Sequence, residues 1–364
     1  MIVNYDESIL SYIASIRRYF GLSSSYTDNS SFTKLLCKQR PEKVFVLLID
    51  GMGSRLIKRK LKEDSFLRRH QLYETTTVFP STTTAATTSI RNGKSPNENG
   101  WLGWAQYLKE IDDIIIPFQD KGFYNGKKYP DGTFYNCIPV TSTEEELEKI
   151  GIKGRKLFPS FEKDGCEDFN RMCDRLIGFS YDDKYEYIYA YWDKYDSYMH
   201  EHGPDSKICD AYLEYINYQI ENLASKLNKN TMLVVLADHG QVTINRYYNF
   251  YNSKYDKYFV RKPSLETRAQ VFFIKDEYKE RFEKEFKEEF EDDYILLPNK
   301  LVKESKLFGS HENHPRFDEF IGDYLAIGKS DLAFIYHEKG KKVFIGQHAG
   351  MCDDEMYIPI IVHY

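Results

Sequence analysis

Three apolar segments, each followed by an acidic residue, constrain the fold of this chain more than any other feature. They are Val44–Ile49, Tyr187–Trp192 and Met232–Ala237. Strands without polar alternation are typical of a sheet that helices cover on both faces. Between the second and third segments, Ala211–Leu227 carries leucine and isoleucine at helical spacing, which predicts a crossover helix. This order of elements predicts a doubly wound, mostly parallel α/β core.

Two stretches interrupt this pattern. Residues 105–170 are rich in glycine, proline, tyrosine and aspartate and contain several turn signals, whereas residues 250–340 alternate strand patterns with one charged helix. The second stretch therefore predicts an α+β insertion into the core. The expected organisation is a core of residues 1–104, 170–250 and 340–364, a loop-rich cap segment of residues 105–169, and an inserted α+β cap subdomain of residues 251–339.

Composition excludes several classes of protein. The 364 residues are 29% charged and 41% apolar, which is too apolar for a disordered chain, and no uncharged apolar run approaches the length of a membrane span. A net charge of −6 with both signs interspersed argues against binding to a nucleic-acid polymer. The N-terminus shows no secretory signal and the six cysteines form no CxxC pair, so we expect reduced thiols and a cytoplasmic location. The sequence does not define an oligomeric state.

Candidate metal ligands follow the predicted strands. Ligands of α/β sheets bind beyond the carboxyl ends of the strands, and acidic and imidazole side chains gather at those positions. Asp196 and His200 are four residues apart, so on a helix they share one face. Oxygen and imidazole ligands without thiolates suit Zn²⁺ or Mn²⁺, and the set is large enough for two ions. The candidates are Asp50, Asp193, Asp196, His200, Asp238, His239 and His348.

Each of these residues also has an ordinary interpretation. An aspartate at a strand end can form a turn or cap a helix. The Asp196/His200 pair can lie on a solvated helix face, and His348 can be a hydrogen-bonded loop histidine. Their joint occurrence at the ends of successive strands favours a metal site.

A hydroxyl-rich segment, Phe79–Gly93, predicts the start of a helix. Pro80 blocks helix upstream, and Ser81 or Thr82 can cap. A hydroxyl in the first turn would face the positive end of the helix, which suits a phosphate, although a threonine-rich cap and packing seam is an equal alternative. Further on, the aromatic residues of Trp101–Tyr107 could stack on a nucleobase or seal the cap against the core.

Together these motifs resemble the alkaline phosphatase superfamily, and their order and spacing resemble its type I phosphodiesterase/nucleotide pyrophosphatase branch. The resemblance implies an alkaline-phosphatase-like core that holds two divalent ions, zinc by preference with manganese as the alternative. It assigns one ion to Asp50, Asp238 and His239, and the other to Asp196, His200 and His348. The motifs that carry it are Leu47–Gly53, Phe79–Ala86, Asp196–Pro204, Ala237–Gly240 and Gly346–His348.

The resemblance also implies a threonine nucleophile ten residues before the glycine that ends its helix. Gly93 then selects Thr83, with Thr82 and Thr84 as alternatives. Two positions depart from the family pattern. Val78 stands before the Phe-Pro pair, where related phosphodiesterases place the nucleophile, and Trp104 stands where they carry a phosphate-binding asparagine.

The implied function is hydrolysis of phosphate esters of small, nucleotide-like substrates through a covalent threonine intermediate. Trp104 and Arg268 are candidate substrate contacts, with Arg91 as a further possible phosphate contact. A phosphomonoesterase, phosphonate hydrolase or phosphomutase on the same scaffold is the alternative, because such relatives carry similar caps. A non-catalytic metal-stabilised binding protein is the third class. No membrane or nucleic-acid partner is expected.

Overall fold

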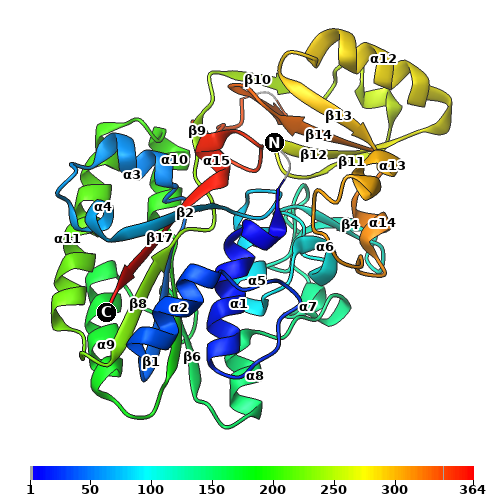
Figure 1. Ribbon diagram of the computed structural model, residues 1–364. Helices are drawn as coiled ribbons and strands as arrows, with labels where there is room; N and C mark the ends of the chain where they lie inside the picture. The colour runs from blue at the N-terminus through cyan, green and yellow to red at the C-terminus, as the bar shows by residue number, and fades with distance from the viewer. Residues whose placement is uncertain (1–2, 339) are drawn as a thin grey trace.

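A six-stranded central sheet organises the computed structural model, which describes residues 3–338 and 340–364 (Figure 1). Its strand order is β2-β17-β8-β1-β7-β6. The strands are β1 (Lys43–Ile49), β2 (Gln71–Thr76), β6 (Gly154–Leu157), β7 (Tyr187–Trp192), β8 (Thr231–Leu236) and β17 (Tyr357–His363).

The three central strands are the apolar segments of the sequence. Strand β1 pairs in parallel with β7 on one side and β8 on the other, and every residue of these three strands is buried. Strand β6 adds in parallel to β7, whereas β17 runs antiparallel to β8 and β2. The predicted doubly wound, mostly parallel α/β core is therefore confirmed.

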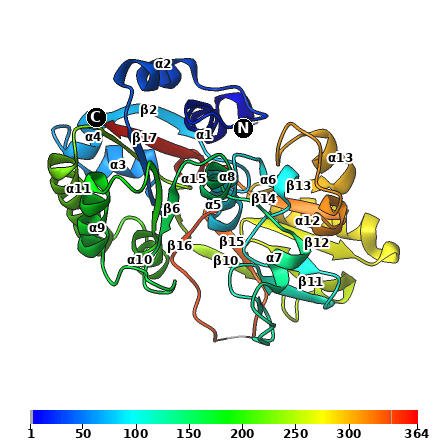
Figure 2. The ribbon, with the colours of Figure 1, turned by 90° about the horizontal axis from the view of Figure 1, so that it is seen from below.

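Helices cover both faces of this sheet, as the burial of its centre requires. Helices α1, α2, α5 and α8 lie on one face, and α3, α4, α9, α10 and α11 lie on the other (Figure 2). The bounds are α1 (Ile9–Tyr19), α2 (Ser30–Gln39), α3 (Ser54–Lys60), α4 (Phe66–His70), α5 (Thr83–Asn92), α8 (Thr143–Lys149), α9 (Phe169–Tyr181), α10 (Lys194–His202) and α11 (Lys207–Lys226).

One predicted boundary is wrong. Strand β6 and helix α8 lie within residues 105–169, the segment expected to form a loop-rich cap, yet β6 is the edge strand of the central sheet. The strand is short, and Arg155 and Lys156 give it a polar sequence. Charged residues are common on edge strands, which have one unpaired side, so the apolar pattern that identifies the central strands is missing here.

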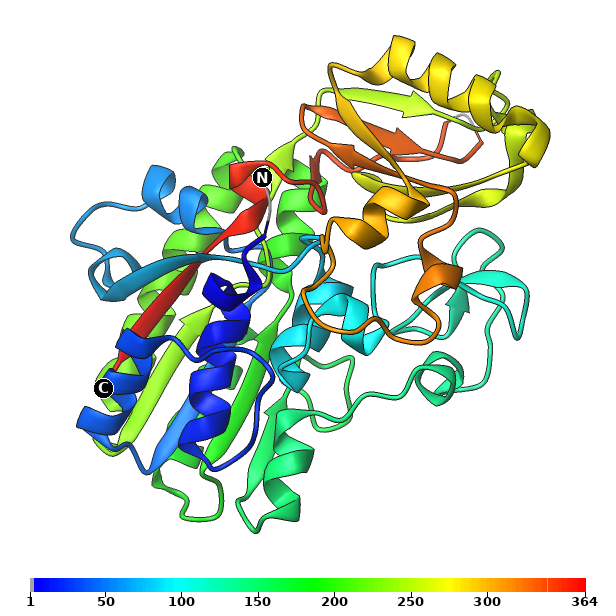
Figure 3. The same cartoon turned by 45° about the vertical axis from the view of Figure 1, so that its right-hand side comes forward.

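The inserted cap is a four-stranded antiparallel sheet of order β11-β12-β14-β13 with helix α12 packed on it (Figure 3). Its core is a cluster of aromatic side chains, including Phe250, Phe272, Phe282, Phe286 and Phe334, that is separate from the main core. The cap therefore has its own hydrophobic centre. Its elements are β11 (Phe259–Leu265), β12 (Ala269–Ile274), α12 (Lys279–Phe290), β13 (Tyr294–Pro298) and β14 (Tyr324–Gly328).

Short elements connect the core and the cap. Two-stranded pairs join β9 to β16 and β10 to β15, and β3, β4 and β5 form a small sheet. Within the described residues, no helix has the length and apolar character of a membrane span. The remaining strands are β3 (Gln106–Leu108), β4 (Asp113–Ile116), β5 (Lys121–Gly122), β9 (Val242–Thr243), β10 (Arg246–Asn249), β15 (Leu332–Ile335) and β16 (Gly346–Gln347). The remaining helices are α6 (Pro96–Asn99), α7 (Thr133–Cys137), α13 (Asn299–Glu304), α14 (Phe317–Phe320), α15 (Asp353–Met356) and the 3₁₀ turns Tyr5–Glu7, Asp256–Tyr258 and Asp276–Tyr278.

Candidate active site

The carboxyl ends of β1, β7 and β8 meet at one edge of the sheet and bring the predicted metal ligands together. Asp50 follows β1 directly, and its N–H donates to the carbonyl of Trp192 at the end of β7 (2.9 Å). Helix α10, which follows β7, carries Asp196 and His200, and Asp238 and His239 follow β8. His348 directly follows β16.

The first ligand group consists of Asp50, Asp238 and His239, all of them buried. One ligand atom from each lies within 4.8 Å of the others. Nε2 of His239 is 3.3 Å from Oδ1 of Asp50 and 3.5 Å from Oδ2 of Asp238. The structure thus brings together the three residues that the resemblance assigns to one ion.

The second group centres on Asp196. One atom each of Asp196, His239 and His348 lies within 4.8 Å of the others. Nε2 of His200 is 3.2 Å from Oδ2 of Asp196, and Nε2 of His348 is 4.0 Å from Oδ1. The residues expected to hold the other ion are therefore adjacent as well, and His239 belongs to both groups.

Each of the three imidazoles is oriented by a main-chain carbonyl at its Nδ1. The partners are Gly346 for His200 (2.8 Å), Gly240 for His239 (3.0 Å) and Ser81 for His348 (3.0 Å). If Nδ1 carries the proton and donates it to the carbonyl, Nε2 has a free lone pair that faces the carboxylates. Such support fixes the tautomer and ring orientation of metal-binding histidines.

The carboxylates are supported in the same way. Tyr191 donates its hydroxyl to Oδ2 of Asp50, and Gln241 donates its side-chain amide to Oδ1 of Asp196. Oδ1 of Asp238 accepts the N–H groups of Gly51 (3.1 Å) and His239 (3.0 Å). Its Oδ2 is buried without a hydrogen-bond partner among the described residues. A buried, unpaired carboxylate oxygen fits a metal ligand.

The electrostatics of the cluster also fit cations. Burial raises the pKa of Asp50 well above its usual range, and the charges of Asp238 and Asp196 add to the effect. Burial likewise raises the pKa of Asp238. At Asp196 burial acts in the same direction, but the charge and hydrogen bond of His200 outweigh it and hold the pKa below its usual range. Asp50 and Asp238 thus lack compensating positive charge, which divalent ions would supply.

The hydroxyl of Thr83 faces this cluster. Thr82 is the N-cap of α5 and Thr83 its first residue, and Gly93 ends the helix with a φ of 70°. Oγ1 of Thr83 is 3.2 Å from Nε2 of His239 and 3.4 Å from Oδ2 of Asp50. Thr82 instead donates its hydroxyl to Glu266, and the hydroxyl of Thr84 is buried without a hydrogen-bond partner among the described residues. Of the three candidate threonines, Thr83 has the geometry of a nucleophile.

Two arginines considered as phosphate contacts lie elsewhere. Arg268 is fully buried, and its Nε and Nη2 donate to the two carboxylate oxygens of Glu355 at 2.7 and 2.9 Å. Its Nη1 donates to main-chain carbonyls, so the expectation that Arg268 contacts substrate is corrected: its donors are used in a buried structural pair.

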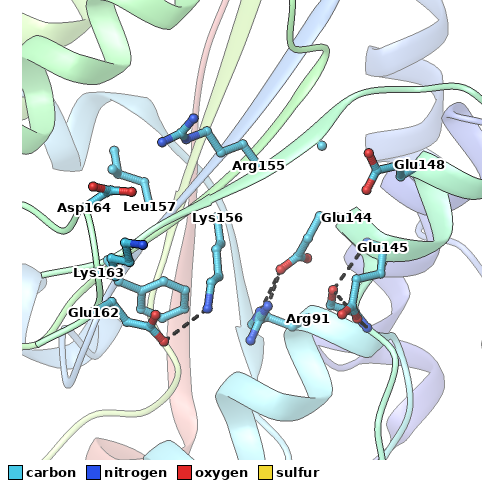
Figure 4. Close-up of a pocket in the computed structure, with 13 residues that line it drawn as sticks. Arg91, Glu144, Glu145, Glu148, Arg155, Lys156, Leu157, Glu162, Lys163 and Asp164 are labelled. Atoms are coloured by element: carbon cyan, nitrogen blue, oxygen red, sulfur yellow. Dashed lines mark hydrogen bonds and ion pairs between the residues drawn. The ribbon is translucent and has the colours of Figure 1, made fainter.

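Arg91 is located far along α5 from Thr83, a separation of about 12 Å at 1.5 Å per residue. It pairs with Glu144 and lines a cavity of about 390 Å³ beside β6 (Figure 4). The side chain of Arg91 therefore lies at the edge of the sheet, away from the ligand cluster.

The two tryptophans of the aromatic segment have different surroundings. Trp101 is buried, packs against Phe134, and donates its indole N–H to the carbonyl of Ile138 (3.0 Å), so it seals the cap. Trp104 is half-buried near α5, and its main-chain N–H donates to Oε1 of Glu266 (2.7 Å).

Glu266 is a site residue that the sequence analysis missed. It lies in the turn between β11 and β12, and burial raises the pKa of its carboxyl to about 7 although Thr82 and Trp104 donate to it. Nothing in the sequence distinguishes this glutamate from those in ordinary surface turns. Only the position of the cap brings it to the start of α5.

Comparisons with known proteins show the family and the fold of this chain. The family model described as type I phosphodiesterase / nucleotide pyrophosphatase matches residues 44–351. A search of curated proteins found no match. Similar solved structures include murine ectonucleotide pyrophosphatase / phosphodiesterase 5, with a TM-score of 0.67 and 13% identity over 88% of each chain. An inactive threonine-to-alanine variant of that protein is recorded in complex with AMP.

A second kind of relative shares the fold at a similar level. Phosphonoacetate hydrolase from Sinorhizobium meliloti 1021, in complex with phosphonoformate, has a TM-score of 0.64 and 12% identity over 89% of this chain and 90% of its own. At this level of identity these structures establish a common fold.

Proposed function

Because this chain belongs to the type I phosphodiesterase / nucleotide pyrophosphatase family of phosphoric ester hydrolases, we propose that it cleaves small nucleotide-like phosphodiesters through a covalent intermediate on Thr83. The observation that carries this proposal is the position of Oγ1 of Thr83, within 3.5 Å of Asp50 and His239 in the ligand cluster. The AMP complex of the murine relative supports a small phosphorylated substrate.

We propose that two divalent ions complete the site. Asp50, Asp238 and His239 would hold one, and Asp196, His200 and His348 the other, with zinc preferred by this mixture of carboxylate and imidazole ligands. When bound, such ions act as Lewis acids that lower the pKa of a hydroxyl or a water molecule and stabilise charge on phosphoryl oxygens.

The chain's own groups then explain the two steps. Oγ1 of Thr83 releases its proton to solvent and forms a bond to phosphorus while the bond to the ester oxygen breaks, and the leaving group takes up a proton from solvent. Water next attacks the phosphorus of the threonyl ester, the Oγ1–P bond breaks, and Thr83 regains its proton. The α5 N-terminus places free main-chain N–H groups beside this reaction, which suits a phosphoryl group.

Hydrolysis of phosphonates or phosphomonoesters is the second candidate. The phosphonoacetate hydrolase fold and the presence of Trp104 at the asparagine position of related phosphodiesterases favour it. Paired assays with bis-p-nitrophenyl phosphate, p-nitrophenyl phosphate and phosphonoacetate separate the candidates. Faster turnover of the diester by wild type, lost in Thr83→Ala, is the expected result. Turnover of phosphonoacetate alone would replace the first proposal with the second, and metal binding without any turnover would indicate a binding protein.

A further inference from the structure

The cap brings one carboxyl group to the start of α5. Oε1 of Glu266 accepts two hydrogen bonds there, one from the hydroxyl of Thr82 and one from the main-chain N–H of Trp104 (2.7 Å). Thr82 is the N-cap of α5 and directly precedes Thr83, so the carboxyl group lies at the start of the helix that carries the proposed nucleophile. Neither ligand group includes Glu266, and the proposed mechanism makes no use of it.

The turn that carries Glu266 is held rigidly against the core. The N–H of Leu265 donates to the carbonyl of Ala105 (2.5 Å), and the N–H of Ala105 donates back (3.1 Å). Thr267 donates its hydroxyl to the side chain of Gln347 (3.0 Å), beside His348. A Cβ on Gly103 would lie 3.2 Å from the Cα of Leu265, so a glycine permits this close approach.

The backbone of this turn is strained. Leu265 has a φ of +66°, a left-handed conformation that non-glycine residues rarely adopt. Strain of this kind persists where the surrounding structure fixes it and is common at functional sites. The contacts on either side of Glu266 therefore hold its carboxyl group in one place.

The second carboxylate oxygen is available to a ligand. Oε2 of Glu266 makes no hydrogen bond to any residue in 3–338 or 340–364, and it is not among the buried atoms left without a partner. The residue as a whole is half-buried.

We propose that Glu266 is a specificity-determining residue. It favours substrates with one negative charge at the attacked phosphorus over dianionic phosphomonoesters, and this inference rests on the proposed function. A fixed carboxylate beside the phosphoryl group repels a second anionic oxygen more than an esterified one. Like charges placed together in a site of low dielectric disfavour the wrong partner strongly. A diester and the inner phosphorus of a nucleoside triphosphate both meet this requirement.

The test compares kcat/KM for bis-p-nitrophenyl phosphate and p-nitrophenyl phosphate in wild type and Glu266→Gln at pH 8, above the pKa of about 7 to which burial raises the Glu266 carboxyl. Glutamine keeps the size and the oxygen that accepts from Thr82 and Trp104, but it removes the charge. We expect the monoester-to-diester ratio of kcat/KM to rise at least about tenfold in this variant. Glu280→Gln, which removes an exposed glutamate on α12, is the matched control and should leave the ratio at its wild-type value.

A binding measurement gives an independent readout. In a Thr83→Ala background at pH 8, calorimetry would compare phenylphosphonate, a dianion, with its singly charged monoethyl ester. Glu266→Gln should tighten binding of the dianion at least about tenfold and change binding of the monoanion by less than about threefold.

Two results would overturn the inference. An unchanged ratio in Glu266→Gln would show that the charge does not select substrate, and an equal fall for both substrates would show that Glu266 only supports Thr82. If wild type hydrolyses neither ester, the proposed function fails, and the calorimetric comparison still decides the role of Glu266.

Discussion

Oγ1 of Thr83 lies 3.2 Å from Nε2 of His239, the imidazole that the two candidate ligand groups share. The hydroxyl is therefore positioned by the residue on which both groups depend. Substitution of His239 should therefore affect metal binding and catalysis together, whereas substitution of Thr83 should affect catalysis alone.

The first prediction concerns the shared histidine. Wild type should hold about two divalent ions per chain, and His200→Ala should keep about one. His239→Ala should keep fewer, because His239 would hold the ion of Asp50 and Asp238 and also lies within 4.8 Å of the ligand atoms of Asp196 and His348, which would hold the other. Elemental analysis after dialysis measures this. Chelation should also lower the melting temperature, since ions bound only to the native state stabilise it. Equal metal content in the two variants would contradict a shared role.

The second prediction concerns the support of Asp50. Tyr191→Phe removes the buried hydroxyl that donates to Oδ2 of Asp50, so metal affinity should fall about 10–100-fold. Tyr189→Phe is a matched control on the same strand, because the hydroxyl of Tyr189 is buried with no hydrogen-bond partner among the described residues. Competition with a fluorescent zinc chelator measures both affinities. A loss of the same size in both variants would indicate a general effect of β7 on stability.

The third prediction is a pH dependence in the metal-free protein. Burial raises the pKa of Glu266 from its ordinary 4.5 to about 7. A raised pKa in the folded state gives stability that is fully present below pH 4.5 and is lost as the pH rises through about 7. Glu266→Gln cannot lose a proton, so its free energy of unfolding should rise relative to wild type across this interval and then level off.

Urea denaturation from pH 4 to pH 8.5, after treatment with EDTA, measures this difference. Asp50 and Asp238 also have raised pKa values, but they are present in both proteins and their effects cancel in the comparison. A difference that stays constant between pH 4.5 and pH 8 would show that the Glu266 carboxyl is not held in an environment that favours its neutral form.

Local sequence patterns predicted the core because each central strand and the acidic residue that follows it are contiguous in the sequence. All-apolar strands identify β1, β7 and β8, and the acidic residues that follow them identify the ligand cluster, since parallel strands end at one edge of the sheet. The family and its hydrolytic activity, first recognised from these motifs, are confirmed. The ions, the intermediate on Thr83 and the cytoplasmic location stay predictions.

Long-range contacts account for what the sequence did not show. Glu266 reaches Thr82 across 184 positions of the chain, and Arg268 pairs with Glu355 across 87. From the sequence alone, Arg268 could contact phosphate. Its bonds to Glu355, which exclude this role, are visible only in the structure. Strand β6 was missed for a different reason, because a polar edge strand lacks the apolar run that marks a buried one.

The last prediction concerns Thr83. Successive residues of a helix point about 100° apart, so only one of the three neighbouring threonines can face the ligand cluster, and in the structure Thr83 does. A nucleophile needs an approach of about 3–3.5 Å, which a neighbouring hydroxyl cannot supply. Thr83→Ala should therefore lower kcat at least about a thousandfold, with metal content and fold unchanged.

Thr84→Ala is the matched control on the same helix turn, because the buried hydroxyl of Thr84 has no partner among the described residues, and kcat should fall far less. Thr82→Ala should also cost less than Thr83→Ala, since its hydroxyl is bonded to Glu266. Rapid quenching with substrate and mass spectrometry should find the phosphoryl adduct on Thr83. An adduct on Thr82 or Thr84, or wild-type turnover by Thr83→Ala, would assign the nucleophile to another residue. A threonine that only supports the helix forms no covalent bond to phosphorus, so the modified residue identifies the nucleophile.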